Sequence, residues 1–225
     1  MNPAFPSAVL WDLDGTLADS EEYHWLSWRD AMRAEGVELT YDRFLASFGQ
    51  RNDRILGAWL GEAADATRIR RIGDWKEAEY RRLAEARGLT PLAGAREWVE
   101  RLRRDGWKQA IASSAPRLNV ETMLHVLKFD GLIDAMVSAD EVKKGKPDPD
   151  VFLAAAAAVS VPPSRCVVVE DAPAGVEAGR RAGMKTVGVN AKSPLAADVY
   201  VTSLADLPPD AFERLLTSAF RRKVP

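Results

Sequence analysis

The sequence predicts an α/β protein whose parallel sheet is covered on both sides by helices and is interrupted, after its first strand, by a helical insertion. Short β-branched and apolar runs alternate with helical stretches along most of the chain, which is the order that builds such a sheet. The interval from about Glu21 to Leu89 departs from this order, because amphipathic helical patterns follow one another there without a strand.

Five runs have the continuous apolar character of buried parallel strands. They are Ala8–Trp11, Gln109–Ala112, Val167–Val169, Thr186–Val189 and Val199–Val201. The lone cysteine, Cys166, opens the third of these runs, where a small buried side chain suits a strand, and a single cysteine excludes an internal disulfide.

Helical patterns lie between the predicted strands. They are Glu97–Arg104, Asn119–Leu127, Asp150–Val159 and Gly175–Ala182. The last one is followed by Gly183, and glycine commonly ends helices. Alternating strands and helices predict a Rossmann-like, doubly wound parallel-sheet core.

The insertion is expected to form a small α-helical cap domain. It begins after Gly15, and the cluster of helix breakers at 88–91 restores the α/β alternation. The expected core domain therefore comprises residues 1–19 and 92–225, and the cap comprises residues 20–91. Four tryptophans are expected to pack the core of the cap rather than line a substrate pocket: Trp25, Trp28, Trp59 and Trp75.

The charge balance limits the classes of partner. Lys and Arg total 31 against 33 Asp and Glu, so the net charge of -2 offers no general attraction for nucleic acid or anionic membranes. Met1–Ala8 lacks the features of a signal peptide, and no run approaches the ~18–20 apolar residues of a membrane span. We expect a soluble, cytoplasmic protein with no evident obligate protein partner.

Two carboxylates follow the first strand, in the run Trp11–Leu17. Asp12 and Asp14 are two residues apart and can face one point, and Gly15 allows the chain to turn away sharply. A carboxylate nucleophile and a second carboxylate acting as acid and base need this closeness. The alternative is an acidic turn after a strand.

Hydroxyl and basic residues form two further clusters. Ser113 and Ser114 lie between a strand and a helix, where hydroxyls and backbone N–H groups can hold phosphate oxygens or can simply cap the helix. Lys146 lies within the basic run 143–150, where a Pro-Asp-Pro turn directs its position. The alternative for this run is a solvated basic loop.

Two more acids, Glu170 and Asp171, end the third predicted strand. Hard oxygen ligands of this kind suit Mg²⁺, although acids at the start of a helix can also serve as caps. We expect each of the four clusters to stand at a strand end, and therefore all four to lie at one crevice of the sheet.

The order of the four clusters resembles that of the haloacid dehalogenase superfamily of phosphatases and phosphomutases. Four motifs each stand at a strand end: D-x-D-G-T-L, paired serines, Lys-Pro and Glu-Asp. The run at 145–152 is as characteristic as the first motif. The resemblance spans essentially the whole chain. It implies phosphate chemistry with Mg²⁺ as cofactor rather than dehalogenation, because Asp14 and the metal-binding acids belong to the phosphate-handling branches.

The resemblance also implies a role for each residue. Asp12 would be the nucleophile, Asp14 the acid and base, and Lys146 a catalytic cation that offsets charge and orients Asp12. The residues implied in phosphate binding are Thr16, Ser113 and Ser114, and Lys146 would also be a phosphate ligand. Those implied in binding Mg²⁺ are Asp12, Asp14 through its carbonyl, Asp171, and Glu170 through water.

Two cap residues match the β-phosphoglucomutase-like subgroup. His24 would help to position the acid and base, or would be a polar group at a helix start. Arg51 would grip a substrate phosphate, or would be exposed on a charged helix. Ser47 stands where the mutases carry a lysine, and the run 115–117 replaces their Ser-Lys-Asn.

These departures favour a phosphatase acting on a small phosphorylated metabolite, such as a sugar phosphate. A β-phosphoglucomutase-type mutase is the alternative. A non-catalytic module that binds phosphometabolites is a third reading, against which the complete set of acids and Lys146 argues.

Overall fold

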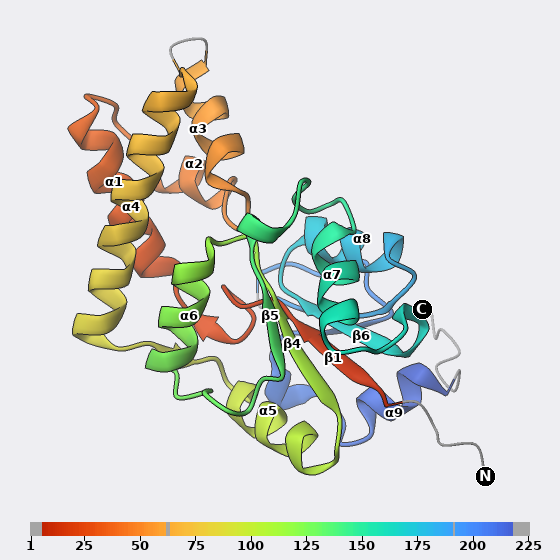
Figure 1. Ribbon diagram of the computed structural model, residues 1–225. Helices are drawn as coiled ribbons and strands as arrows, with labels where there is room; N and C mark the ends of the chain where they lie inside the picture. The colour runs from red at the N-terminus through yellow and green to blue at the C-terminus, as the bar shows by residue number, and fades with distance from the viewer. Residues whose placement is uncertain (1–5, 62–63, 191, 218–225) are drawn as a thin grey trace.

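A six-stranded parallel sheet forms the centre of the computed structural model, which describes residues 6–61, 64–190 and 192–217 (Figure 1). The strand order is β5-β4-β1-β6-β7-β8. The strands are β1 (Ala8–Trp11), β4 (Lys108–Ala112), β5 (Ala135–Val137), β6 (Cys166–Glu170), β7 (Lys185–Val189) and β8 (Val199–Val201). Because β4 and β6 flank β1 on opposite sides, the strand order reverses there, and a crevice opens at the carboxyl ends.

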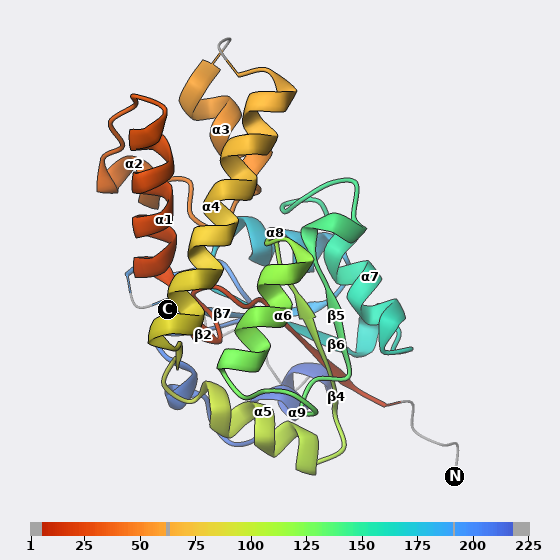
Figure 2. The same ribbon diagram turned by 60° about the vertical axis from the view of Figure 1, so that its left-hand side comes forward.

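Helices cover both faces of this sheet (Figures 1 and 2). One face carries α5 (Ala95–Arg104), α6 (Arg117–Val126) and α9 (Ala211–Leu216), and the other carries α7 (Asp150–Ala158) and α8 (Pro173–Arg181). Successive residues of β1 point to opposite faces, so Val9 packs on the first side and Leu10 on the second. The predicted doubly wound sheet is confirmed.

The predicted strands and helices agree with the observed ones to within two residues at each end, and β1 and β8 agree at both ends. The sequence did not predict β5, α9 or the antiparallel pair formed by β2 (Ala18–Asp19) and β3 (Thr90–Pro91). These elements have two to six residues, which is too short for a hydrophobic period to stand out.

The insertion after β1 is helical, as predicted. It contains α1 (Glu21–Ala34), α2 (Tyr41–Leu45), α3 (Asn52–Leu60) and α4 (Ala66–Arg87). These helices enclose a hydrophobic cluster of their own, separate from the two clusters that flank the sheet. The pairing of β2 with β3 brings together the two segments that connect the cap with the core. The exact domain boundaries stay a prediction.

The tryptophans of the cap follow the prediction in part. Trp28 and Trp59 are buried in the cap cluster, and Trp25 packs against it while also lining the cleft described below. Trp75 is 48% exposed, so its predicted place in the cap core was wrong. The buried face of α4 contains Ile72 and the residues that follow it by one and by two helical turns. Trp75 does not lie on this face, which is why it is exposed.

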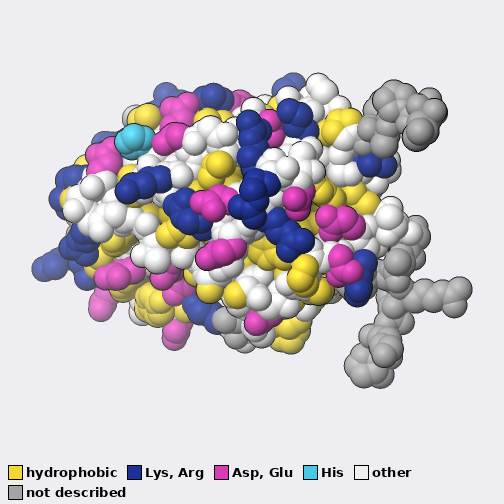
Figure 3. All heavy atoms as spheres, turned by 90° about the horizontal axis from the view of Figure 1, so that it is seen from below, with side chains coloured by type: hydrophobic (Ala, Val, Ile, Leu, Met, Phe, Trp, Pro, Cys, Tyr) yellow, Lys and Arg dark blue, Asp and Glu magenta, His cyan; other side chains and the backbone are white. Residues whose placement is uncertain are grey.

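The sequence predicts neither a signal peptide nor a membrane-spanning helix. Most of Met1–Ala8, where we expected no signal peptide, lies outside the described residues. Within the described parts of the chain, no helix has both the length and the apolar character needed to cross a membrane. The underside of the molecule as drawn in Figure 1 carries basic and acidic side chains interspersed with one another (Figure 3).

Candidate active site

The carboxyl ends of the central strands open into a cleft of about 1080 Å³. Its core side is lined by the predicted motifs, namely Asp12, Asp14, Thr16, Ser113, Ser114, Lys146, Glu170 and Asp171. Its cap side includes Trp25, Gln50 and Arg54. Side chains separated by more than a hundred residues are therefore brought to one site, because parallel strands end at the same edge of the sheet.

Asp12 directly follows β1 and is paired with Lys146. The ammonium Nζ lies 2.5 Å from Asp12 Oδ1 and 2.5 Å from Glu170 Oε1, and it donates a hydrogen bond to the Ala112 carbonyl at 3.0 Å. Burial by itself would lower the pKa of Lys146, but the two carboxylates raise that pKa. Lys146 therefore presents a positive charge to Asp12.

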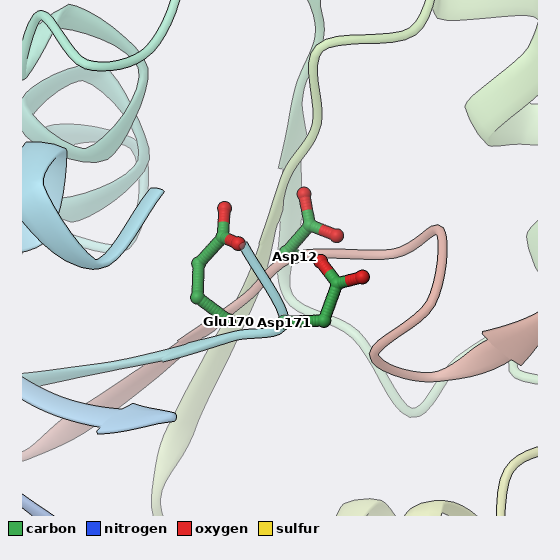
Figure 4. Close-up of side chains that lie close together, drawn as sticks. All are labelled: Asp12, Glu170 and Asp171. Atoms are coloured by element: carbon green, nitrogen blue, oxygen red, sulfur yellow. The ribbon is translucent and has the colours of Figure 1, made fainter. Parts of the chain in front are cut away.

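Asp12, Glu170 and Asp171 form an acidic cluster in which carboxylate oxygens lie within 4.8 Å of one another. Figure 4 shows these side chains converging from the ends of β1 and β6. Burial raises the pKa of Asp12 to about 8; Glu170 adds to this effect and Lys146 opposes it. Burial and the neighbouring Asp12 and Glu170 likewise raise the pKa of Asp171 well above its ordinary value.

Three carboxylates thus lie close to a single ammonium, so the cluster carries more negative than positive charge. A divalent cation bound by hard oxygen donors would offset this excess, and the donor set contains no cysteine or histidine of the kind that zinc prefers. The acidic cluster therefore fits Mg²⁺.

Two glycines allow the backbone to approach these acids. A Cβ at Gly15, where φ is +78°, would lie 2.2 Å from Asp171 Oδ2, and one at Gly175 would lie 1.8 Å from Glu170 Oε1. The backbone at Asp171 is also held by Asn190, whose Nδ2 donates a hydrogen bond to the Asp171 carbonyl at 2.7 Å. Sequence reasoning missed Asn190, since no motif surrounds it.

Asp14 is held by a different set of partners. Its Oδ1 accepts a hydrogen bond from Ser20 Oγ at 2.6 Å and lies 2.8 Å from His24 Nε2. Burial would raise the pKa of Asp14, but His24 and the Ser20 hydroxyl hold that pKa below its ordinary value. An ionised carboxylate with an oriented oxygen therefore faces the cleft.

The other ring nitrogen of His24 meets a buried lysine. Lys76 Nζ lies 2.8 Å from His24 Nδ1, and an ammonium has only donors, so Nδ1 accepts and the ring proton is on Nε2. Neutral His24 thus donates to Asp14, and the ring of Tyr80 stacks on it with centroids 4.1 Å apart. Sequence reasoning missed Lys76, although a lysine on the apolar stripe of α4 was the signal that could have revealed it.

The predicted phosphate ligands lie at the cleft, while their role stays a prediction. Ser113 Oγ accepts from the Ala115 N–H at 3.0 Å, which resembles the capping alternative, yet a hydroxyl can also donate. The Thr16 hydroxyl oxygen is buried and has no hydrogen-bond partner within the described part of the chain. A buried orphan hydroxyl at a cleft is well suited to contact a ligand.

Arg51 is not among the described residues that line the cleft. Its Nη1 donates to the carbonyls of Ala139 and Val142, at 3.1 and 3.2 Å, so the guanidinium joins the cap to the core. Ser47 Oγ donates to the Phe44 carbonyl at 2.8 Å. The predicted phosphate-gripping role of Arg51 is therefore not part of the geometry seen here and stays a prediction.

A parallel sheet with a helical cap inserted after β1, and paired aspartates beside a buried lysine, define a capped α/β enzyme of phosphoric monoesters. The chain belongs to the haloacid dehalogenase-like hydrolase family, whose profile matches residues 9–189. The predicted resemblance is thereby confirmed.

Similar proteins include both mutases and phosphatases. The chain is 34% identical to β-phosphoglucomutase of Bacillus subtilis (strain 168), covering 89% of this chain and 91% of that protein. It is 32% identical to validoxylamine A 7'-phosphate phosphatase of Streptomyces hygroscopicus subsp. limoneus, covering 88% and 94%. The crystal structure of β-phosphoglucomutase from Clostridium difficile has the same fold, with a TM-score of 0.86, 24% identity and coverage of 96% and 100%.

A further relative is much longer than this chain. Protein SUPPRESSOR OF QUENCHING 1, chloroplastic, of Arabidopsis thaliana is 37% identical over 81% of this chain, and the match spans 18% of that protein.

Proposed function

We propose that this protein is a Mg²⁺-dependent phosphatase that hydrolyses a small phosphorylated metabolite, such as a sugar phosphate, through an aspartyl-phosphate at Asp12. The observation that carries this proposal is the contact of Asp12 with Lys146 inside a cluster of acids at a cleft. The relatives that match over most of their own length are named for a phosphomutase and a phosphatase. A cytoplasmic setting suits a chain whose lone thiol, Cys166, is buried and free.

The first step forms a bond between Asp12 Oδ and phosphorus while the bond from phosphorus to the leaving oxygen breaks. Asp14 donates a proton to that oxygen, so the product leaves as an alcohol. The resting pKa of Asp14 is low, but the negative charge of an incoming phosphate favours the protonated form. Lys146 offsets the charge that gathers on Asp12 and the phosphoryl oxygens.

The second step releases inorganic phosphate. Asp14, now ionised, removes a proton from water, the water oxygen attacks phosphorus, and the bond to Asp12 breaks. What Mg²⁺ would supply, held by Asp12, Asp171, the Asp14 carbonyl and Glu170 through water, is positive charge beside the phosphoryl oxygens.

The alternative is a β-phosphoglucomutase-type mutase, in which a sugar hydroxyl rather than water attacks the aspartyl-phosphate. Such a cap needs firm ligands for a second phosphate. Here Ser47 is bonded within the cap and Arg51 donates to carbonyls of the core. This arrangement favours water as the acceptor and hence the phosphatase.

The deciding experiment follows two products at once. The enzyme is mixed with Mg²⁺, β-glucose 1-phosphate and a trace of the 1,6-bisphosphate, and glucose 6-phosphate and inorganic phosphate are measured together. We expect inorganic phosphate from this and other simple monoesters, with little isomer, while Asp12→Asn provides the blank. Efficient isomer formation with little phosphate would establish the mutase instead, and the absence of both products would remove the sugar phosphate from the proposal.

A further inference from the structure

A buried charged network extends from His24 into the cap, and the reaction steps above do not use its far end. Lys76 and Glu77 are 1% and 5% exposed, and Lys76 Nζ lies 3.0 Å from Glu77 Oε1. The rings of Trp28 and Tyr80 lie beside the same ammonium, with centroids at 5.1 and 5.3 Å. A buried ammonium needs a counter-charge, and the Glu77 carboxylate supplies it.

Glu77 has partners on both sides of the boundary between cap and core. Its Oε1 accepts from Asn52 Nδ2 of the cap at 2.7 Å, and its Oε2 accepts from Asn119 Nδ2 on α6 of the core. Arg81 Nη1 donates to Asn119 Oδ1 at 2.7 Å. Since that oxygen is occupied as an acceptor, the amide NH₂ of Asn119 must face Glu77.

We propose that Glu77 is a positioning residue for Asp14, an inference that rests on the proposed function. Glu77 holds Lys76 as an oriented cation, Lys76 keeps Nδ1 of His24 as an acceptor, and His24 therefore presents Nε2–H to Asp14 Oδ1. Without Glu77 the ammonium loses its buried counter-charge, and Lys76 no longer keeps Nδ1 as an acceptor, so the proton on Nε2 is held by Asp14 alone.

Asn119 ties this arrangement to the position of the cap. It is a core residue that donates to a cap carboxylate, so all of the contacts exist together only when α4 lies against α6. Glu77 thus aligns the acid and base where the cap covers the cleft. A purely structural Glu77 would hold α4 in place without affecting the ring of His24.

The first test measures which ring nitrogens of His24 carry a proton, and it needs no enzyme turnover. The chain has two histidines: His24, which is buried, and His125, whose side chain is 83% exposed and serves as an internal reference. In ¹⁵N-histidine-labelled protein we expect His24 to be a single neutral Nε2–H tautomer. Glu77→Gln should replace this signature with a mixture of ring states, whereas the matched control Glu79→Gln, on a carboxylate paired with Arg82, should not.

The second test compares two leaving groups. A sugar phosphate needs a proton on its leaving oxygen, whereas p-nitrophenyl phosphate expels a stable phenolate without one. We expect Glu77→Gln to lower kcat/KM for the sugar phosphate by about 10- to 100-fold, and for the aryl phosphate by less than about threefold. Asn119→Ala, which leaves the Lys76–Glu77 pair intact, should show the same selectivity to a smaller degree and replaces Glu77→Gln should that variant fail to fold.

An equal loss on both substrates with an unchanged His24 spectrum would overturn the inference and make Glu77 a structural residue. No loss on either substrate would overturn it as well. A wild-type enzyme that hydrolyses neither ester would refute the proposed phosphatase, while the His24 spectrum would still decide the role of Glu77.

Discussion

Two buried charged clusters meet at the cleft, and they differ in their charge balance. The core cluster consists of Asp12, Glu170, Asp171 and Lys146. The cap-border cluster consists of Asp14, His24, Lys76 and Glu77. In the core cluster the pKa values of Asp12 and Asp171 are raised, whereas in the cap-border cluster those of Asp14 and Glu77 are lowered.

The difference follows from the partners of each carboxylate, since both clusters are buried. Asp14 receives donors from Ser20 and His24, and Glu77 receives donors from lysine and two amides. Asp12 and Glu170 share one ammonium, and Asp171 lies beside them. In the cap-border cluster each carboxylate therefore has its own donors, while in the core cluster three carboxylates share one ammonium, an imbalance that the proposed Mg²⁺ would offset.

The largest effect is expected when the core cluster loses its nucleophile. Asp12→Asn fills the same volume but cannot form an acyl phosphate, so turnover should fall by about 10³-fold or more. The midpoint of thermal unfolding should not fall, because the substitution removes a buried carboxylate whose negative charge is only partly offset by Lys146. Phosphate release and a melting curve would be measured beside the surface control Asp30→Asn; appreciable turnover by purified Asp12→Asn would refute the assignment.

A smaller effect is expected from pH and Mg²⁺ on the stability of the same cluster. The folded pKa of Asp12, about 8, exceeds the unfolded value of about 4. Its contribution to stability is thus fully present below about pH 4 and is lost as the pH rises through about 8. The pKa values of Asp14 and Glu77 are lowered. Their contributions to the stability of the fold are therefore lost only on acidification, and they do not cancel the decrease with rising pH that is expected from Asp12.

We therefore expect the chelated protein to melt several degrees lower at pH 8.5 than at pH 6, since each kcal/mol shifts the midpoint by about 2–4 °C in a chain of this size. Mg²⁺ should raise the midpoint more at pH 8.5 than at pH 6, because it binds the deprotonated acids. Asp171→Asn should remove most of the Mg²⁺ increment. A midpoint that responds neither to pH in this range nor to Mg²⁺ would contradict the charge imbalance.

The smallest effect is expected from Arg51, which lies in neither cluster. Arg51→Ala removes hydrogen bonds to two core carbonyls, each worth about 1 kcal/mol, so stability should fall while KM for a sugar phosphate changes by less than about threefold. Arg29→Ala, on an exposed ion pair, is the control. A tenfold or greater rise in KM with unchanged stability would restore the phosphate-gripping role that the sequence predicts.

Local pattern was sufficient where residues close in sequence decide the outcome. The apolar run at Ala8–Trp11 predicted β1 with its observed ends, and the two acids after it were predicted to face the crevice. Pattern failed for β5, a three-residue strand at the edge of the sheet, and for Trp75, whose aromatic character suggested burial although it lies off the buried stripe of α4.

The sequence by itself determined the alternation of strands and helices, the helical insertion and the acids and lysine that gather at the strand ends, because apolar periodicity and strand-end motifs are local properties of the chain. Only the tertiary structure decided how charge is balanced. Glu77 and Asn119 are 42 residues apart, and neither belongs to a motif. Their pairing, and hence the fixed ring of His24, exists because α4 packs on α6 and excludes water from both side chains.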